Sequence, residues 1–433
     1  MKFNKNIKLL SLRYSFLFLL HIFLSFSFLN LSHSAEPRTW TNLKGQNIKA
    51  QLIAVDGDYV ILRLQNGRDS RILRKTLSIG DQKFLEEYGG AEKIPIDPKG
   101  KITVPEKEMK FNSKTLIKRD DKFELPDGYS LQFDIVESEH FLIMSSGKVR
   151  GKDTAELAER LWYGMNFQHP GFAEKWGDEK KAIFLCGEKT DYDILGKYYV
   201  DQLANSGRAQ EASNSARTWP MSSGAGLFLD NDTCDKYNVM NGARAFRADS
   251  KSNFQRGVWN PFPAHCIAQD VLSVQMGGAG GGAGSEGYYA ISTGHGYYKE
   301  IQLTDETVTS LLDANTYESD EVVKSGGFDD GKKWARTLRD LVKKEKVSPS
   351  LAALYRVNRA SELTPELTVL MYGFARYMQS TPDRISKFSK VMERVDTSRS
   401  IPVPLEMAKL FGFETVQEFE TDWINYLKSS AFK

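Results

Sequence analysis

This sequence contains few cysteines and histidines, and its net charge is small. Its 433 residues include three cysteines and six histidines, and the formal net charge is only +2. The odd number of cysteines permits at most one intramolecular disulfide, and the spacing of Cys186, Cys234 and Cys266 fits no metal motif. A net charge this small gives no electrostatic basis for binding nucleic acid. We therefore expect no nucleic-acid partner.

Long apolar runs are absent after residue 31. The single run, from Tyr14 to Leu31, follows a basic segment and precedes the small residues Ser34 and Ala35. This layout is typical of a secretory signal peptide, which we assign to residues 1–35. An uncleaved signal anchor is the alternative, because the run is near the lower limit for crossing a bilayer. We expect an exported protein, periplasmic or extracellular, whose mature chain has no membrane span.

What remains is an ordinary globular composition, with 41% hydrophobic and 26% charged residues. Residues 36–90 predict a small β domain, because Asp56-Gly57 and Asn66-Gly67 separate β-rich segments and favour hairpin turns. Ser78 and Asp81 predict the start of a short helix that runs through Tyr88. A domain of this size and pattern is expected to be a partly open, SH3-like β barrel.

The same segment resembles the Sla-one homology domain, a module named from a yeast endocytic adaptor. The resemblance rests on the two turns and on five short stretches: Arg38 to Thr41, Gly45, Ala50 to Leu52, Leu77-Ser78 and Asp81 to Leu85. In the adaptor the module binds peptides that contain Asn-Pro-Phe, so the resemblance implies protein or peptide binding here. The chain carries that tripeptide itself, at Asn260-Pro261-Phe262, where it also fits an ordinary helix entry.

Residues 91–128 are rich in proline, glycine and charge, and we expect them to be a linker. Residues 129–430 then predict an α/β segment followed by helices. Strands are expected near 131–135, 141–144, 182–186, 224–229 and 243–248. Helix starts are expected at a capping box of Asp153 with Glu156, at Thr190, at Thr364 and at a capping box of Thr415 with Glu418. The glycine tract at 277–287 is expected to be a flexible connector.

Residues 129–430 resemble an exported, peptidase-like family of the gluzincin class. The resemblance is most specific at Glu139-His140-Phe141, at Ala182 to Asp191 and from Leu367 through Trp423. It implies a zincin-like domain, so the whole chain is expected to be α+β. In active relatives one helix carries HExxH, whose two histidines bind Zn²⁺ and whose glutamate activates the bound water. A second helix supplies a glutamate as the third ligand.

The matching positions here lack most of that chemistry. His265 keeps a ligand type, but Cys266 stands at the general base, Gln269 at the second histidine and Thr293 at the third ligand. The resemblance thus implies a degenerate site with no catalytic residue, no metal and no cofactor. We read the remaining mature histidines, His140, His169 and His295, as core or surface residues.

Three functions compete. The first is a non-catalytic pseudopeptidase that acts as an adaptor-like, protein- or peptide-binding protein of the cell envelope, with self-association left open. The second is an active metal- or thiol-dependent hydrolase with atypical groups such as His265, Cys266 and His295, to which Glu286 or Glu300 could be added. The third is a purely structural envelope protein.

Overall fold

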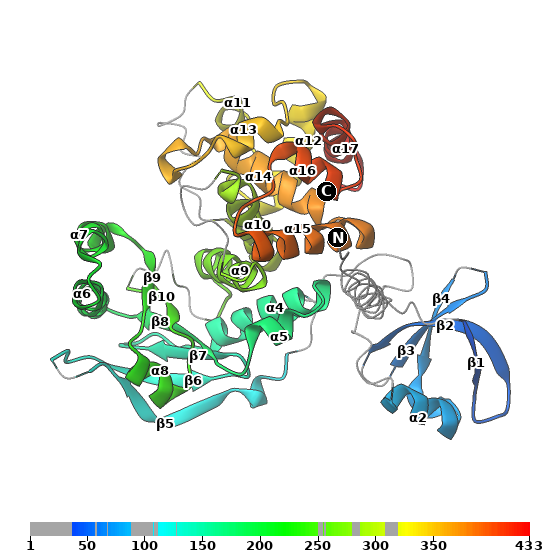
Figure 1. Ribbon diagram of the computed structural model, residues 1–433, viewed down its shortest axis with the longest axis horizontal. Coiled ribbons are helices and arrows are strands. Elements are labelled where there is room, and N and C mark those ends of the chain that lie inside the picture. The colour runs from blue at the N-terminus through cyan, green and yellow to red at the C-terminus, as the bar shows by residue number, and fades with distance from the viewer. Residues whose placement is uncertain are drawn as a thin grey trace, which may run out of the picture. The chain divides into compact units, whose positions relative to one another are not determined.

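The chain is α+β and divides into two compact units, Met1–Gly100 and Lys101–Lys433. The computed structural model describes residues 37–56, 59–66, 68–87, 107, 111–126, 128–249, 254, 257–278, 286–307 and 319–433. Within these residues it contains 15 α-helices and two sheets, of four and six strands (Figure 1). The expected signal peptide, residues 1–35, lies outside the described residues.

In its described residues, the first unit is a four-stranded antiparallel meander with one α-helix. Its elements are β1 (Arg38–Thr41), β2 (Asn47–Asp56), β3 (Tyr59–Leu64), β4 (Asp69–Leu73) and α2 (Ile79–Glu87). The strand pairing confirms the two predicted hairpins, β2 with β3 and β3 with β4. The turn glycines Gly57 and Gly67 lie outside the described residues.

Trp40 forms the centre of the core of this unit, at 1% exposure, with Val60, Leu62, Leu77 and Leu85 around it. Its indole N–H donates to the carbonyl of Ala50 at 3.0 Å, so the buried ring leaves no polar group unpaired.

Asp81 joins the helix to the first strand. Its carboxylate accepts from the backbone N–H of Thr41 at 2.8 Å and from the guanidinium of Arg38 at 2.7 Å. The Ser78 hydroxyl also donates to Asp81, at 2.9 Å, and accepts from its N–H, which confirms the predicted helix start.

The second unit is built on a six-stranded mixed sheet of order β5-β6-β7-β8-β10-β9. The strands are β5 (Ile117–Glu124), β6 (Gln132–Glu137), β7 (Phe141–Ser145), β8 (Lys181–Cys186), β9 (Gly224–Phe228) and β10 (Gly242–Arg247). Only β7 with β8 and β8 with β10 pair in parallel in the described sheet. The expected strands of residues 129–430 are confirmed.

Strand β5 lies inside the segment 91–128, which the sequence predicted to be a linker. Phe123 on this strand is fully buried and contacts the rings of Phe133, Phe184 and Tyr237. The other side chains of β5 are exposed or partly exposed, and most of them are charged. One buried aromatic residue therefore fixes this charged edge strand to the sheet, and the second unit begins earlier than residue 129.

Both faces of the central strands are covered, as parallel strands require. Phe141, Ile143 and Leu185 point to one face, where they pack with α4 (Lys152–Gln168) and α9 (Pro261–Gln275). Leu142 and Phe184 point to the opposite face, toward α6 (Lys189–Asn205) and α8 (Asn231–Tyr237). The side chains alternate with the period of two of a strand, which separates two hydrophobic cores.

The start of α4 differs from the prediction. The helix begins at Lys152 after Gly151, without a side-chain cap, and Asp153 lies inside its first turn. The Asp153 carboxylate accepts from the N–H of Gly257 at 2.9 Å, and Glu156 pairs with Arg160 at 2.9 Å. A long-range contact and an i,i+4 pair thus replace the predicted capping box.

The C-terminal part of the second unit is helical and lies above α9 in the view of Figure 1. Its helices in the described residues are α10 (Tyr288–Thr304), α11 (Glu321–Lys324), α12 (Trp334–Lys343), α13 (Leu351–Tyr355), α14 (Pro365–Met378), α15 (Pro382–Ser398), α16 (Pro404–Leu410) and α17 (Val416–Lys428). The predicted caps are confirmed: Thr364 caps α14, and Thr415 with Glu418 forms a capping box on α17. In the described part of the chain, none of the helices has the length and apolar character needed to cross a bilayer.

Candidate functional site

Helices α9 and α10 pack side by side and carry every residue of the predicted degenerate site. Pro261 occupies the first turn of α9, where its missing N–H costs nothing. Two glycines let α10 approach its neighbours closely. A Cβ at Gly294 would overlap the carbonyl oxygen of Met371 on α14, and one at Gly296 would lie 2.8 Å from the ring of His265 on α9. Helix α10 is therefore held tightly between α9 and α14.

His265 points into the contact between α9 and α10. Its Nδ1 lies 3.0 Å from Oε2 of Glu300, and its ring meets that of Tyr297 edge to face at 4.5 Å between centroids. The Glu300 side chain is only 1% exposed. The carboxylate beside His265 is thus Glu300, one of the two candidates named from the sequence. The other candidate, Glu286, is exposed at the start of α10, where its charge acts on Tyr355.

Cys266, which the resemblance places at the general base, is 7% exposed and close to a half-buried ion pair. That pair joins Arg244 of β10 to Asp270 of α9 through two hydrogen bonds, one of them 3.0 Å long. Burial, aided by the negative charges of Asp270 and Glu300, raises the pKa of the Cys266 thiol to about 12 against the lowering effect of Arg244. A thiol with this pKa stays protonated at neutral pH and is a poor nucleophile.

No hydrogen bond joins Cys266 to His265 or to His295 among the described residues. His295 is 1% exposed, and its Nδ1 lies 3.2 Å from the amide nitrogen of Gln379, which also donates to the carbonyl of Ala375. The Nδ1 atom of His295 therefore accepts a hydrogen bond, so this nitrogen carries no proton. The geometry gives no support to a thiol–imidazole pair.

The other two positions of the degenerate site add no ligand. Gln269 lies one turn after His265 on α9 and is half-buried, and Thr293 on α10 is 6% exposed. In the part of the chain that the structure describes, no group of three or more His, Cys, Asp or Glu side chains could hold a metal ion. The three cysteines, Cys186, Cys234 and Cys266, are free thiols.

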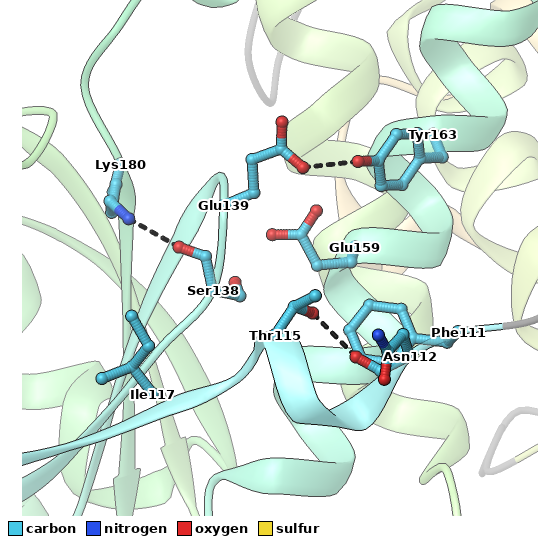
Figure 2. A pocket seen from close by; sticks show the side chains of 9 residues that line it. All are labelled: Phe111, Asn112, Thr115, Ile117, Ser138, Glu139, Glu159, Tyr163 and Lys180. Carbon is cyan, nitrogen blue, oxygen red and sulfur yellow. Dashed lines mark hydrogen bonds between the residues drawn. The ribbon is translucent and has the colours of Figure 1, made fainter.

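Glu139 and His140 lie in the turn between β6 and β7, and Phe141 begins β7, beside a pocket of about 380 Å³ (Figure 2). His140 stacks on Trp162 at 3.4 Å between ring centroids. The buried carboxylate of Glu159 accepts from the backbone N–H of His140 at 2.7 Å and lies 2.8 Å from its Nδ1. Glu159, on α4, thereby fixes the conformation of this turn.

Figure 2 shows how the polar side chains of this pocket lie. The Tyr163 hydroxyl donates to Glu139 at 2.5 Å, and Lys180 donates to the carbonyl of Ser138 at 2.6 Å. Burial, together with the hydrogen bond to Glu139, raises the pKa of Tyr163. The charged side chains Glu139 and Lys180 each already have a hydrogen-bond partner. The pocket therefore fits a polar binding pocket better than a catalytic centre. In the sequence, Glu139 and His140 were notable only because they support the family resemblance. No local pattern predicted that Glu159 and Tyr163, on α4, would belong to a pocket.

Comparison of the chain with known protein families, with curated proteins and with solved structures finds no match.

Proposed function

We propose that this chain is an exported, non-catalytic pseudopeptidase that binds protein or peptide at the cell envelope. The observation that carries the proposal is the pairing of His265 with Glu300 in the contact between α9 and α10. The carboxylate occupies Nδ1, which leaves Nε2 as the only ring nitrogen able to bind a metal. One imidazole is far short of the three protein ligands that a catalytic zinc site uses.

The neighbourhood of Cys266 supports the same proposal. Hydrolysis needs a base that can take a proton from the attacking water. Here the position next to His265 carries a buried thiol with a raised pKa, packed beside the Arg244–Asp270 pair. The alternative of a thiol-dependent hydrolase would need Cys266 to ionise, which this environment opposes.

The binding half of the proposal rests on the first unit and its resemblance to a peptide-binding, SH3-like module. Two large apolar side chains of this unit are unusually exposed, Leu43 at 65% and Ile79 at 81%. Backbone hydrogen bonds place them in one region, since Leu43 N donates to Thr76 O at 2.9 Å and Ser78 N donates to Thr41 O at 2.7 Å. Exposed apolar side chains that lie close together are a common feature of protein-binding surfaces.

The chain's own Asn-Pro-Phe tripeptide does not suit the role of ligand. Asn260 is 7% exposed and Pro261 is buried at the start of α9. The ring of Phe262 packs against that of Phe246 at 5.7 Å and closely over Gly224. A partner peptide is therefore expected from another molecule.

Zinc content and peptidase activity test the non-catalytic half. The purified mature protein, dialysed against zinc and then against buffer, is expected to retain well below one zinc per chain and to cleave no peptide. His265→Ala should retain the same amount. About one tightly held zinc per chain that is lost in His265→Ala would contradict the proposal. Gln269→His combined with Thr293→Glu is the positive control, because it should create zinc binding if these positions face one another.

A peptide-library screen of the full mature chain tests the binding half. We expect Leu43→Ser combined with Ile79→Ser to weaken binding of selected peptides at least about tenfold, as loss of two buried apolar contacts predicts. Met221→Ser is the control, because Met221 is equally prominent on the second unit at 76% exposure. Absence of any selected peptide would leave the structural envelope protein as the better description.

A further inference from the structure

A second cleft, of about 720 Å³, lies at the carboxyl end of strand β7. It is at the end of the strand opposite to the pocket of Figure 2. The loop between β7 and α4 forms one side, and residues of β5 and β6 form the other. In open α/β sheets, ligands bind at the carboxyl ends of the parallel strands, and β7 pairs in parallel with β8. The volume is in the range of small-molecule sites.

Four cationic side chains line this cleft: Lys118, Lys148, Arg150 and Lys152. All four are exposed, and none forms an ion pair or side-chain hydrogen bond with any described residue. Asp134 is the one acid among the described lining residues, and its carboxylate is already paired with Lys122. The cleft therefore concentrates positive charge that the protein itself does not neutralise.

The loop that carries Lys148 and Arg150, and the start of α4 that carries Lys152, are held in place by their neighbours. The Ser146 hydroxyl donates to Asp191 at 2.6 Å and accepts from the N–H of Gly187 at 3.1 Å, which ties the loop after β7 to the loop after β8. A Cβ at Gly187 would overlap the carbonyl oxygen of Ser146, so the two backbones touch. A Cβ at Gly151 would lie 2.8 Å from Ile143, so the start of α4 packs directly on β7. The cations are presented by a fixed scaffold, which lowers the entropy cost of binding.

The start of α4 adds to the positive potential. This 17-residue helix has no side-chain cap at Gly151, so its first N–H groups face the loop without a side-chain cap, although Asp153 in its first turn offsets part of the dipole. The positive end of a helix favours anions, and lysine and arginine contacts to phosphate or carboxylate oxygens are charge-assisted.

We propose that this cleft binds a small organic anion that carries two or more phosphate or carboxylate groups. The recognition uses Lys148, Arg150 and Lys152 from the loop side and Lys118 from the sheet side. The apolar floor, formed in part by Val136 and Val149, can contact the carbon skeleton of the ligand. This inference is independent of the peptidase-like site, because none of the residues involved belongs to α9 or α10.

Titration calorimetry on the full mature chain tests the proposal, with inorganic pyrophosphate and citrate as probes. At least one of the two is expected to bind with a Kd below about 1 mM. Binding should weaken as salt rises from about 50 to about 200 mM, because the cations are exposed. Preference for pyrophosphate would assign the natural ligand to phosphate compounds, and preference for citrate to polycarboxylates.

Matched variants locate the site. Lys148→Ala combined with Arg150→Ala should weaken binding at least about tenfold, since each removes a charge-assisted contact. Lys390→Ala combined with Lys409→Ala removes the same charge from two exposed residues of α15 and α16 and should change binding less than about twofold. Equal weakening by both pairs, no saturable binding of either anion, or binding of a poly-glutamate peptide alone would overturn the proposal.

Discussion

Two histidines are buried in the helical core, and acid is expected to destabilise the protein through them. His169 is completely buried, with Nδ1 2.6 Å from the Ser389 hydroxyl and Nε2 without a partner among the described residues. Burial, and next the positive charge of Lys299, lowers the pKa of His169 to about 3. The same two causes, with smaller effects of His169 and His265, hold the pKa of His295 well below its usual value.

The direction of the pH effect follows from the sign of these shifts. A histidine whose folded-state pKa is depressed binds its proton more readily in the unfolded chain. Its contribution to stability is complete above the unfolded pKa of about 6.5 and is lost as the pH falls from there toward about 3. One pKa unit corresponds to 1.36 kcal/mol, so His169 alone should lower the free energy of unfolding by about 2 kcal/mol between pH 7 and pH 5.

Carboxylates also titrate in acid, so the effect must be isolated by a variant. His169→Asn keeps a hydrogen-bonding group near the position of Nδ1 but cannot be protonated. The free energy of unfolding is measured by urea denaturation followed by tryptophan fluorescence. The difference in this free energy between wild type and variant should change by about 2 kcal/mol in favour of the variant from pH 7 to pH 5. Phe388→Leu is the control, because Phe388 packs against His169 at 5.7 Å and does not titrate. If both variants keep a constant difference from the wild type at every pH, His169 is not buried as a neutral ring.

Three further predictions follow from single contacts. Gly294→Ala should lower the free energy of unfolding by roughly 1–3 kcal/mol, because its Cβ meets the backbone of α14, whereas Gly226→Ala on β9 should change it by less than about 0.5 kcal/mol in the same urea assay. Thr415→Ala should cost about 1 kcal/mol in thermal denaturation, because it removes the cap that accepts from Glu418 N at 3.2 Å. Mass spectrometry of the exported protein should find a mature N-terminus near Ala35 or Glu36, and an intact Met1 on a membrane-bound protein would contradict the cleavage.

The elements that the sequence predicted well are those whose signals are local. Alternating apolar residues marked the strand near 131–135, and short apolar runs marked those near 141–144 and 182–186. Thr364 and Thr415 marked the starts of α14 and α17 through their own backbone contacts. The two hairpins of the first unit were marked by their turn residues. Each of these signals is contained within a few residues, so no knowledge of the tertiary structure is needed to read it.

The elements that were missed depend on distant partners. Helix α7 (Ala209–Thr218) is almost wholly polar and buries only Ala212, so it has no apolar stripe. Strand β5 is charged and is defined by Phe123 alone. Helix α8 is the exception, because Asp230 caps it by accepting from Thr233 N at 2.8 Å, which is a local signal in the sequence.

The candidate site shows the same division. That His265 lies on a helix was readable from the sequence, but which residue of the second helix it meets depends on the register between α9 and α10. That register is set by Gly296, over which the His265 ring packs, and it brings Glu300 to Nδ1. The electrostatic surroundings of Cys266 likewise depend on Arg244, a residue of β10 that no local pattern connects to α9.

The surroundings of Cys266 bear on whether a glutamate could stand at position 266, where the resemblance places the general base. Asp270 lies one helical turn after Cys266, and its side chain is 14% exposed. Burial alone would raise its pKa, but the charges of Arg244 and Lys181 and the hydrogen bond from Arg244 together outweigh that effect and lower the pKa. A glutamate at position 266 would add a second carboxylate near Asp270, whose cationic neighbours are Arg244 and, at 3.9 Å, Lys181, and its partial burial would carry a desolvation cost. The neutral thiol and the Arg244–Asp270 pair are therefore one consistent arrangement. The residue at position 266 is thus part of the packing of α9 on β10, and a glutamate there would have to fit that arrangement.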